Sequence, residues 1–85
     1  MISCRYVIST NHGLHADNAM SLSRAASDYQ CKITLESAKG VADCKNVLSL
    51  MSLGAKQGES LILTADGPDE KLAMGYLSGI LRTIL

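Results

Sequence analysis

The sequence predicts a single α+β domain over residues 1–85, in which a four-stranded antiparallel sheet carries three helices on one face. Segments with an apolar period of two alternate with segments of helical period, in the order β-α-β-β-α-β-α. Turn-forming residues separate these segments. Because strand-helix-strand crossovers prefer one hand, we expect the strand order 1-4-2-3.

The composition is that of a small globular protein with an aliphatic core. Hydrophobic residues make up 47% of the chain and aromatic residues only 4%. Eight basic and eight acidic side chains cancel, so the chain lacks the positive surface that binds nucleic acid. No apolar run approaches the ~20 residues of a membrane span, and no secretory signal is recognisable. Three cysteines without C-x-x-C spacing, Cys4, Cys31 and Cys44, favour free thiols in the cytoplasm.

The first predicted strand and helix cover residues 2–8 and 18–29. The strand alternates apolar and polar side chains, and its inward residues are Cys4, Tyr6 and Ile8. The turn formers of residues 9–13 end it. The apolar face of the helix consists of Ala19, Leu22, Ala26 and Tyr29. We expect Asp17 or Asn18 to be its N-cap.

The next two strands are predicted at residues 31–36 and 41–44, joined by a hairpin turn at residues 37–40. The inward side chains of the first of these strands are Cys31, Ile33 and Leu35. In the second, Ala42 and Cys44 are small. This indicates that another element packs closely over them.

A short helix, a strand and a long helix complete the chain. Asn46 is a suitable N-cap for a helix over residues 47–53, which Gly54 ends. The strand at residues 60–65 has Leu61, Leu63 and Ala65 inward. Pro68 marks the start of the last helix, residues 69–85. Its predicted apolar stripe is Ala73, Leu77, Ile80, Leu81 and Ile84, widened by Leu72 and Tyr76.

The segment between the first strand and the first helix holds both histidines, His12 and His15. His15 lies where unpaired backbone amides and the helix dipole favour an anion. A neutral imidazole is a nucleophile at cell pH, so a phosphoryl group on His15 would meet those amides. Gly13 allows a tight loop over this position. The position alone is also compatible with an exposed histidine that has no task.

A metal site is a further interpretation of this segment. His12, His15 and Asp17 have side chains that zinc accepts. The sequence offers no evident fourth ligand and the spacing matches no known site, so we expect no metal and no cofactor.

Three segments of the sequence carry a resemblance to a known family. Gly13-Leu14-His15, the run from Lys45 to Gly58, and the run from Ala65 to Glu70 resemble the HPr family. These are the phosphocarrier proteins of the bacterial phosphoenolpyruvate-dependent phosphotransferase system, and the resemblance covers the whole chain. It implies an HPr-like open-faced β-sandwich. It also implies that His15 accepts a phosphoryl group from Enzyme I and passes it to a IIA domain of a sugar permease.

The resemblance further implies a monomeric phosphoryl relay rather than an enzyme with its own turnover. Partners would dock on an apolar patch from the first and the short helix. The matching positions are Ala16, Met20, Val47, Leu48 and Met51. The alternative is that Leu48 and Met51 are core residues, as apolar side chains on a short helix usually are.

Three residues depart from the family's pattern. Asp17 replaces an arginine, Asn18 replaces a proline, and Asn46 replaces the serine that a regulatory kinase phosphorylates in many Gram-positive members. Asn46 cannot be phosphorylated, but it caps a helix as well as serine does.

Asp17 places a negative charge near the expected phosphoryl group. Two unit charges ~4 Å apart interact by about 1 kcal/mol in water and about 4 kcal/mol at an effective dielectric near 20. The carboxylate either fills the helix N-terminus itself or turns to solvent. His12, where the family usually has asparagine, could restore positive charge among the expected phosphate neighbours, which are His12, Gly13, Ala16, Asp17 and Asn18. The alternative function is a divergent regulatory or binding paralogue that keeps the docking surface and carries no phosphate.

Overall fold

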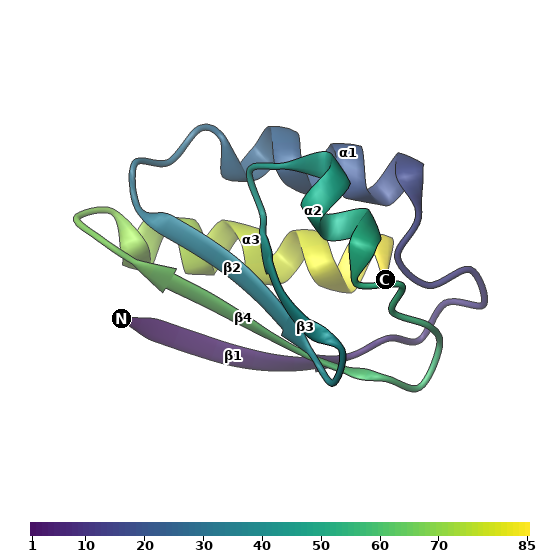
Figure 1. The fold of residues 1–85 in the computed structure, drawn as a ribbon. Helices are drawn as coiled ribbons and strands as arrows, with labels where there is room; N and C mark the ends of the chain where they lie inside the picture. Colours follow the sequence, from purple (N-terminus) through teal and green to yellow (C-terminus); the bar gives the residue numbers. More distant parts are fainter.

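The computed structural model describes residues 1–85 and shows one sheet covered on one face by helices (Figure 1). The strands are β1 (Ile2–Val7), β2 (Lys32–Ser37), β3 (Gly40–Asp43) and β4 (Ser60–Asp66). The helices are α1 (Ala16–Ala26), α2 (Val47–Ser52) and α3 (Glu70–Ile84). The sheet is antiparallel in the order β1-β4-β2-β3. The predicted element order and strand order are confirmed.

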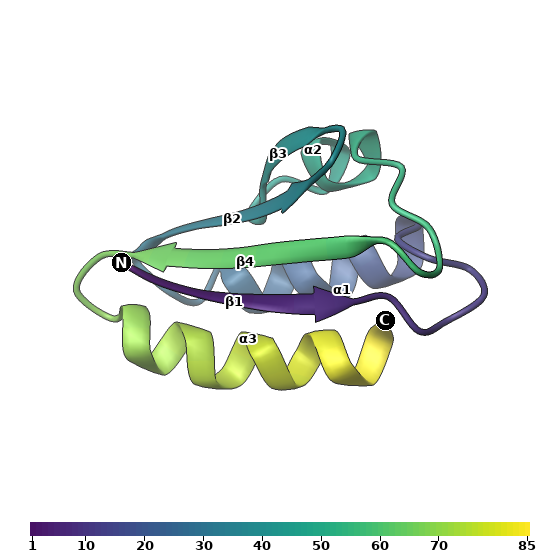
Figure 2. The same cartoon turned by 90° about the horizontal axis from the view of Figure 1, so that it is seen from below.

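The helices enclose one hydrophobic core against the sheet. The long helix α3 packs on β1 and β4, α1 lies beside α3, and α2 lies over β3 (Figure 2). A single cluster of 21 buried hydrophobic residues fills the space between them. None of the three helices combines the length and the apolar character that crossing a membrane requires.

The inward faces of the strands are those that the period-two pattern predicts. Ile33, Leu35, Leu61 and Leu63 are fully buried, and the opposite sheet face is open to solvent. Ala42 and Cys44 are buried as well. Burial raises the pKa of the Cys44 thiol to about 12, so this thiol is not a nucleophile at neutral pH. Cys31 is buried and Cys4 is partly exposed.

The predicted bounds of α1 are wrong at both ends. The helix begins at Ala16 with His15 as its N-cap, and not with Asp17 or Asn18. It ends at Ala26, three residues before the predicted end at Tyr29. The N–H groups of residues 28 and 29 donate to carbonyls three residues earlier, at 3.3 and 3.2 Å. This tighter turn ends the α-helical hydrogen-bond ladder.

The predicted stripe of α3 is too wide on one side. Leu72 is 73% exposed and Tyr76 is 53% exposed, whereas Met74 is buried. Ala73 and Leu77, four residues apart, face the core. Leu72 and Tyr76 each lie one position earlier, and this turns them ~100° around the helix, away from the core. The ring of Tyr76 instead contacts Tyr29, with ring centroids 6.5 Å apart.

Asp69 joins the start of α3 to the start of β2. Its carboxylate accepts hydrogen bonds from the backbone N–H groups of Gln30 at 2.8 Å and Cys31 at 2.9 Å. Although Asp69 is the N-cap of α3, its side chain makes no capping hydrogen bond. The bond from Gln30, followed by those from Cys31, holds the pKa of Asp69 below its ordinary value.

We predict that Asp69→Asn lowers the free energy of unfolding at pH 7, because an amide NH₂ cannot accept the second hydrogen bond. The folded-state pKa of Asp69 is depressed. The carboxylate therefore stabilises the fold above its unfolded pKa of about 3.9, and this contribution is lost as pH falls through the folded value.

Urea unfolding of both proteins at about pH 7 and about pH 2 measures the effect. The difference in stability between native and variant should shrink at the lower pH. Asp28→Asn, at an exposed carboxylate without hydrogen bonds, is the control. An equal difference for Asp69→Asn at both pH values would contradict this role.

Candidate functional site

The candidate site lies where the β1–α1 loop enters α1, at His15. The backbone of His15 is extended, with φ −137° and ψ −175°, and its carbonyl accepts the first helical hydrogen bond from Ala19 at 2.8 Å. The exposed imidazole turns back to the helix, so that Nδ1 accepts the backbone N–H of Asp17 at 3.3 Å. This hydrogen bond requires an unprotonated Nδ1 and assigns the ring proton to Nε2. The nucleophilic lone pair of His15 therefore faces the amides of the first helical turn.

Asn18 holds the loop that carries His15. Its side chain is buried and bridges two backbone groups. Oδ1 accepts the N–H of His15 at 2.7 Å, and Nδ2 donates to the carbonyl of Gly13, also at 2.7 Å. Together with the His15 cap, this forms a capping box. Asn18 is thus a structural clamp rather than the N-cap. In the sequence, the polar amide three residues after His15 is the signal that indicates this capping box.

Gly13 allows the loop to lie directly on the segment after α2. Its φ is +65°, and a Cβ here would lie 2.4 Å from the carbonyl oxygen of Ala55. That oxygen accepts the N–H of the neighbouring Leu14 at 2.9 Å. A side chain at position 13 would therefore clash with backbone, and the expected tight loop at Gly13 is present.

Asp17 is the second residue of α1, and its side chain is exposed. Its carboxylate makes neither a hydrogen bond nor an ion pair; only its backbone N–H and carbonyl have partners. Of the two orientations that the sequence allows, the carboxylate has therefore turned to solvent. It remains beside the imidazole, because Asp17, His15 and His12 line one open hollow.

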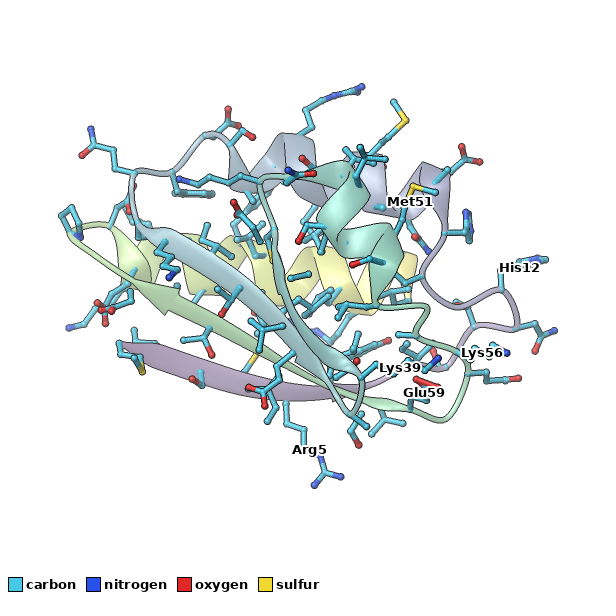
Figure 3. The ribbon with its side chains drawn as sticks, viewed as in Figure 1. Arg5, His12, Lys39, Met51, Lys56 and Glu59 are labelled. Carbon is cyan, nitrogen blue, oxygen red and sulfur yellow. The ribbon has the colours of Figure 1, made fainter.

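His12 lies on the β1–α1 loop and points out into solvent (Figure 3). Its ring meets that of His15 edge to face, with centroids 5.9 Å apart and an angle of 86° between the planes. The structure thus brings together all three residues of the zinc hypothesis. However, no group of three or more His, Cys, Asp or Glu side chains is arranged to hold a metal ion, so the zinc interpretation finds no support.

Several apolar residues of the predicted docking patch are exposed. The exposed fraction is 77% for Leu48, 47% for Met20 and 41% for Met51. Ala16 is exposed too, whereas Val47 is half-buried against the core. The alternative that Leu48 and Met51 are core residues is therefore wrong. Leu50 and Leu53 provide the buried side of this segment instead.

Asn46 is the N-cap of α2, as predicted. Its Oδ1 accepts the backbone N–H of Ser49 at 3.1 Å, and Gly54, with φ +55°, follows the end of the helix. The amide side chain therefore performs the local structural task that a serine would perform.

We predict that Asn18→Ala lowers the free energy of unfolding by about 1–3 kcal/mol, because it leaves a part-buried N–H and a buried carbonyl without their partners. Chemical denaturation measures this effect. Asn11→Ala, at an exposed loop position, is the matched control. A loss no larger than that of the control would show that the bridge does not stabilise the loop.

Comparison with known proteins identifies the family. The family described as the PTS HPr component phosphorylation site matches residues 2–83. The phosphocarrier protein HPr of Mycoplasma pneumoniae is 30% identical over 83 residues, which cover 96% of this chain and 94% of that protein. HPr of Mycoplasma genitalium is 33% identical, over 89% of this chain and 88% of that protein.

Solved structures agree on the fold. HPr-C-His from Thermoanaerobacter tengcongensis superposes with a TM-score of 0.90 at 30% identity, over 98% of this chain and 93% of that one. A mycoplasma histidine-containing phosphocarrier protein superposes with a TM-score of 0.93 at 24% identity, over 96% and 93% of the two chains. Because the family match spans residues 2–83 and relatives of 30% identity or more align over most of both chains, the chain belongs to the HPr family of the phosphotransferase system.

Proposed function

We propose that this protein carries a phosphoryl group on Nδ1 of His15, taken from Enzyme I and passed to a IIA domain of the sugar phosphotransferase system. Membership of the HPr family and the HPr fold support a phosphocarrier role. The observation that carries the proposal is the hydrogen bond from the Asp17 N–H to Nδ1, because it aims the lone pair of His15 at the helix N-terminus. We further propose that the protein acts in the cytoplasm as a monomer.

The chemistry needs only the imidazole and the backbone around it. The lone pair of Nδ1 attacks phosphorus, the N–P bond forms, and the bond from phosphorus to the donor's leaving group breaks with its electron pair. The proton on Nε2 stays in place. As the phosphoryl group replaces the Asp17 N–H at Nδ1, its oxygens face the free amides of the first turn, which attract anions.

The exposed patch is the proposed docking surface for both partners. Its largest exposed side chains are Met20 on α1 and Leu48 and Met51 on α2, and these two helices pack against each other. Methionine side chains are flexible and adapt to different partner surfaces. A single patch could therefore serve a donor and an acceptor in turn.

Asp17 favours a second candidate function. Its unpaired carboxylate lines the hollow in which the phosphoryl group would sit. A protein that uses the patch to bind a partner, without carrying phosphate, would tolerate this charge. The second candidate is therefore a regulatory or binding paralogue.

The two candidates differ in whether His15 gains a phosphoryl group. We predict that incubation with phosphoenolpyruvate and Enzyme I adds one acid-labile phosphoryl group to the native chain and none to His15→Ala. Intact mass spectrometry at neutral pH detects the adduct. His12→Ala is the control, because it removes the other histidine and leaves the proposed acceptor in place.

If the native chain gains no adduct with Enzyme I from the source organism, the carrier function is contradicted and the binding function remains as the candidate. An adduct that persists in His15→Ala would place the phosphoryl group on another residue. Transfer from the phosphorylated chain to a purified IIA domain then tests the second half of the relay.

We predict that Asp17→Arg raises the equilibrium constant for phosphorylation by roughly tenfold or more, because a charge-assisted donor replaces a like charge beside the phosphoryl group. Asp28→Arg is the matched control. It makes the same change in net charge at an exposed position beyond the other end of α1. Equal effects of the two variants on the measured fraction would assign the result to net charge rather than to the site.

A further inference from the structure

We infer that His12, in its protonated form, supplies the positive charge that balances Asp17 and the phosphoryl group, so that phosphorylation of His15 is coupled to pH through His12. This inference rests on the proposed phosphorylation of His15. It assigns His12 a positioning and charge-balancing role. His12 forms no covalent bond to phosphorus.

The geometry places His12 at the phosphoryl position. The His12 and His15 rings are in edge-to-face contact, with centroids 5.9 Å apart. His12, His15 and Asp17 are the residues that line the hollow at the N-terminus of α1. A phosphoryl group on Nδ1 of His15 would therefore share this hollow with both the His12 ring and the Asp17 carboxylate.

The charges around the hollow do not balance without His12. Asp17 has no basic side chain within ion-pair distance, since the ion pairs of this structure involve only the N-terminal amine. A phosphoryl group adds a charge of about −1.5 to −2 near neutral pH. Of the side chains that line the hollow, only the two histidines can become positive. The phosphorylated ring of His15, substituted at Nδ1 and protonated at Nε2, offsets at most one of these negative charges. His12 is the further cation available.

Other charged groups near the loop differ from His12 in where they lie, or in whether their charge changes over the pH range in which imidazoles titrate. From α1, His15 and Asp17 face His12 across the hollow. From the α2–β4 connection, the backbone of Lys56 lies beside Gly13, and its side chain extends from that segment separately from His12 (Figure 3). The base of the loop, in contrast, is held by main-chain hydrogen bonds, because the main-chain oxygen of Leu85 accepts the N–H groups of Ser9 and Thr10. A lysine ammonium is in general charged throughout the range in which imidazoles titrate, so it is not a source of pH dependence there.

The protonated ring of His12 has two N–H donors, and the neutral ring has one. Protonation therefore adds both a charge and a donor toward the phosphoryl oxygens. Both are lost as pH rises through the range in which histidine loses its proton, between about pH 5 and pH 8. The phosphorylated state should thus gain from His12 at low pH and not at high pH.

Phosphoramidate, a small-molecule phosphoryl donor for histidine, tests this role without Enzyme I. The full chain is phosphorylated to equilibrium between about pH 5.5 and pH 8.5, and the adduct is measured by ³¹P NMR and intact mass. Because the acceptor is itself an imidazole, the informative quantity is the ratio of the native to the His12→Asn phosphorylated fraction at each pH. His12 is exposed and makes no hydrogen bond, so its variants should fold; circular dichroism checks this.

We predict that the phosphorylated fraction of the native chain exceeds that of His12→Asn by roughly twofold to fivefold near pH 6, and that the ratio approaches one at the highest pH. His12→Lys should match or exceed the native fraction at every pH and lose the additional pH dependence. In an Asp17→Asn background, His12→Asn should have a smaller effect. Lys56→Gln, the control cation, should leave the pH dependence unchanged.

A ratio that does not change with pH, or equal phosphorylation of native and His12→Asn at every pH, would overturn the role of His12. These outcomes are separate from failure of the carrier function. Phosphorylation of His15 by phosphoramidate but not by Enzyme I would end the carrier proposal and leave the His12 test intact. No adduct on the native chain from either donor would overturn both.

Discussion

The close approach of the β1–α1 loop to the segment after α2 is the contact on which the candidate site depends. Gly13 lies so near Ala55 that there is no space for a side chain, and the next residue, Leu14, donates its N–H to the Ala55 carbonyl. This contact joins residues more than forty positions apart. It fixes the direction in which the chain enters α1, and with it the position of His15 at the first helical turn. The exposed part of α2 is held near the same loop for the same reason.

Asn18 completes this arrangement from the other side. Its buried amide bridges the His15 N–H and the Gly13 carbonyl, so the loop is held both to the neighbouring segment and to its own helix. A proline at this position has no side-chain polar group and could not form the bridge. The departure from the family's usual proline therefore replaces a rigid ring by a pair of hydrogen bonds.

The three departures from the family pattern act at different levels. Asn46 preserves the cap of α2 and removes a hydroxyl group. Asn18 changes how the loop is held. Only Asp17 changes the charge at the candidate acceptor, and its carboxylate has no partner within the chain. The side chains of Asn46 and Asn18 both make structural hydrogen bonds, whereas that of Asp17 makes none. The proposed function therefore depends on the electrostatics of the hollow that Asp17 lines. His12 belongs to the same question, because its imidazole shares this hollow with His15 and Asp17.

The sequence by itself determined the element order, the inward faces of the strands and the strand order. Alternation along a strand and crossover handedness are local or topological rules, and they do not require knowledge of side-chain contacts. It also determined the cap at Asn46, because the capping interaction spans only three residues. The position of His15 at a helix N-terminus and the family resemblance together indicated the acceptor histidine, and the resemblance indicated the docking positions. Both the acceptor role and the docking positions remain predictions.

Tertiary structure decided what depends on contacts between distant segments. The stripe of α3 excludes Leu72 and Tyr76 because only one side of that helix meets β1 and β4. Asp69 is the N-cap residue of α3, but its carboxylate accepts hydrogen bonds from backbone N–H groups 38 and 39 residues away. The helix α1 begins at Ala16, with His15 as its N-cap, since the loop packing at Ala55 and the Asn18 bridge fix where helical dihedral angles begin. The orientation of Asp17 and the contact between the two imidazoles were decided in the same way, because both depend on how a folded loop presents its side chains.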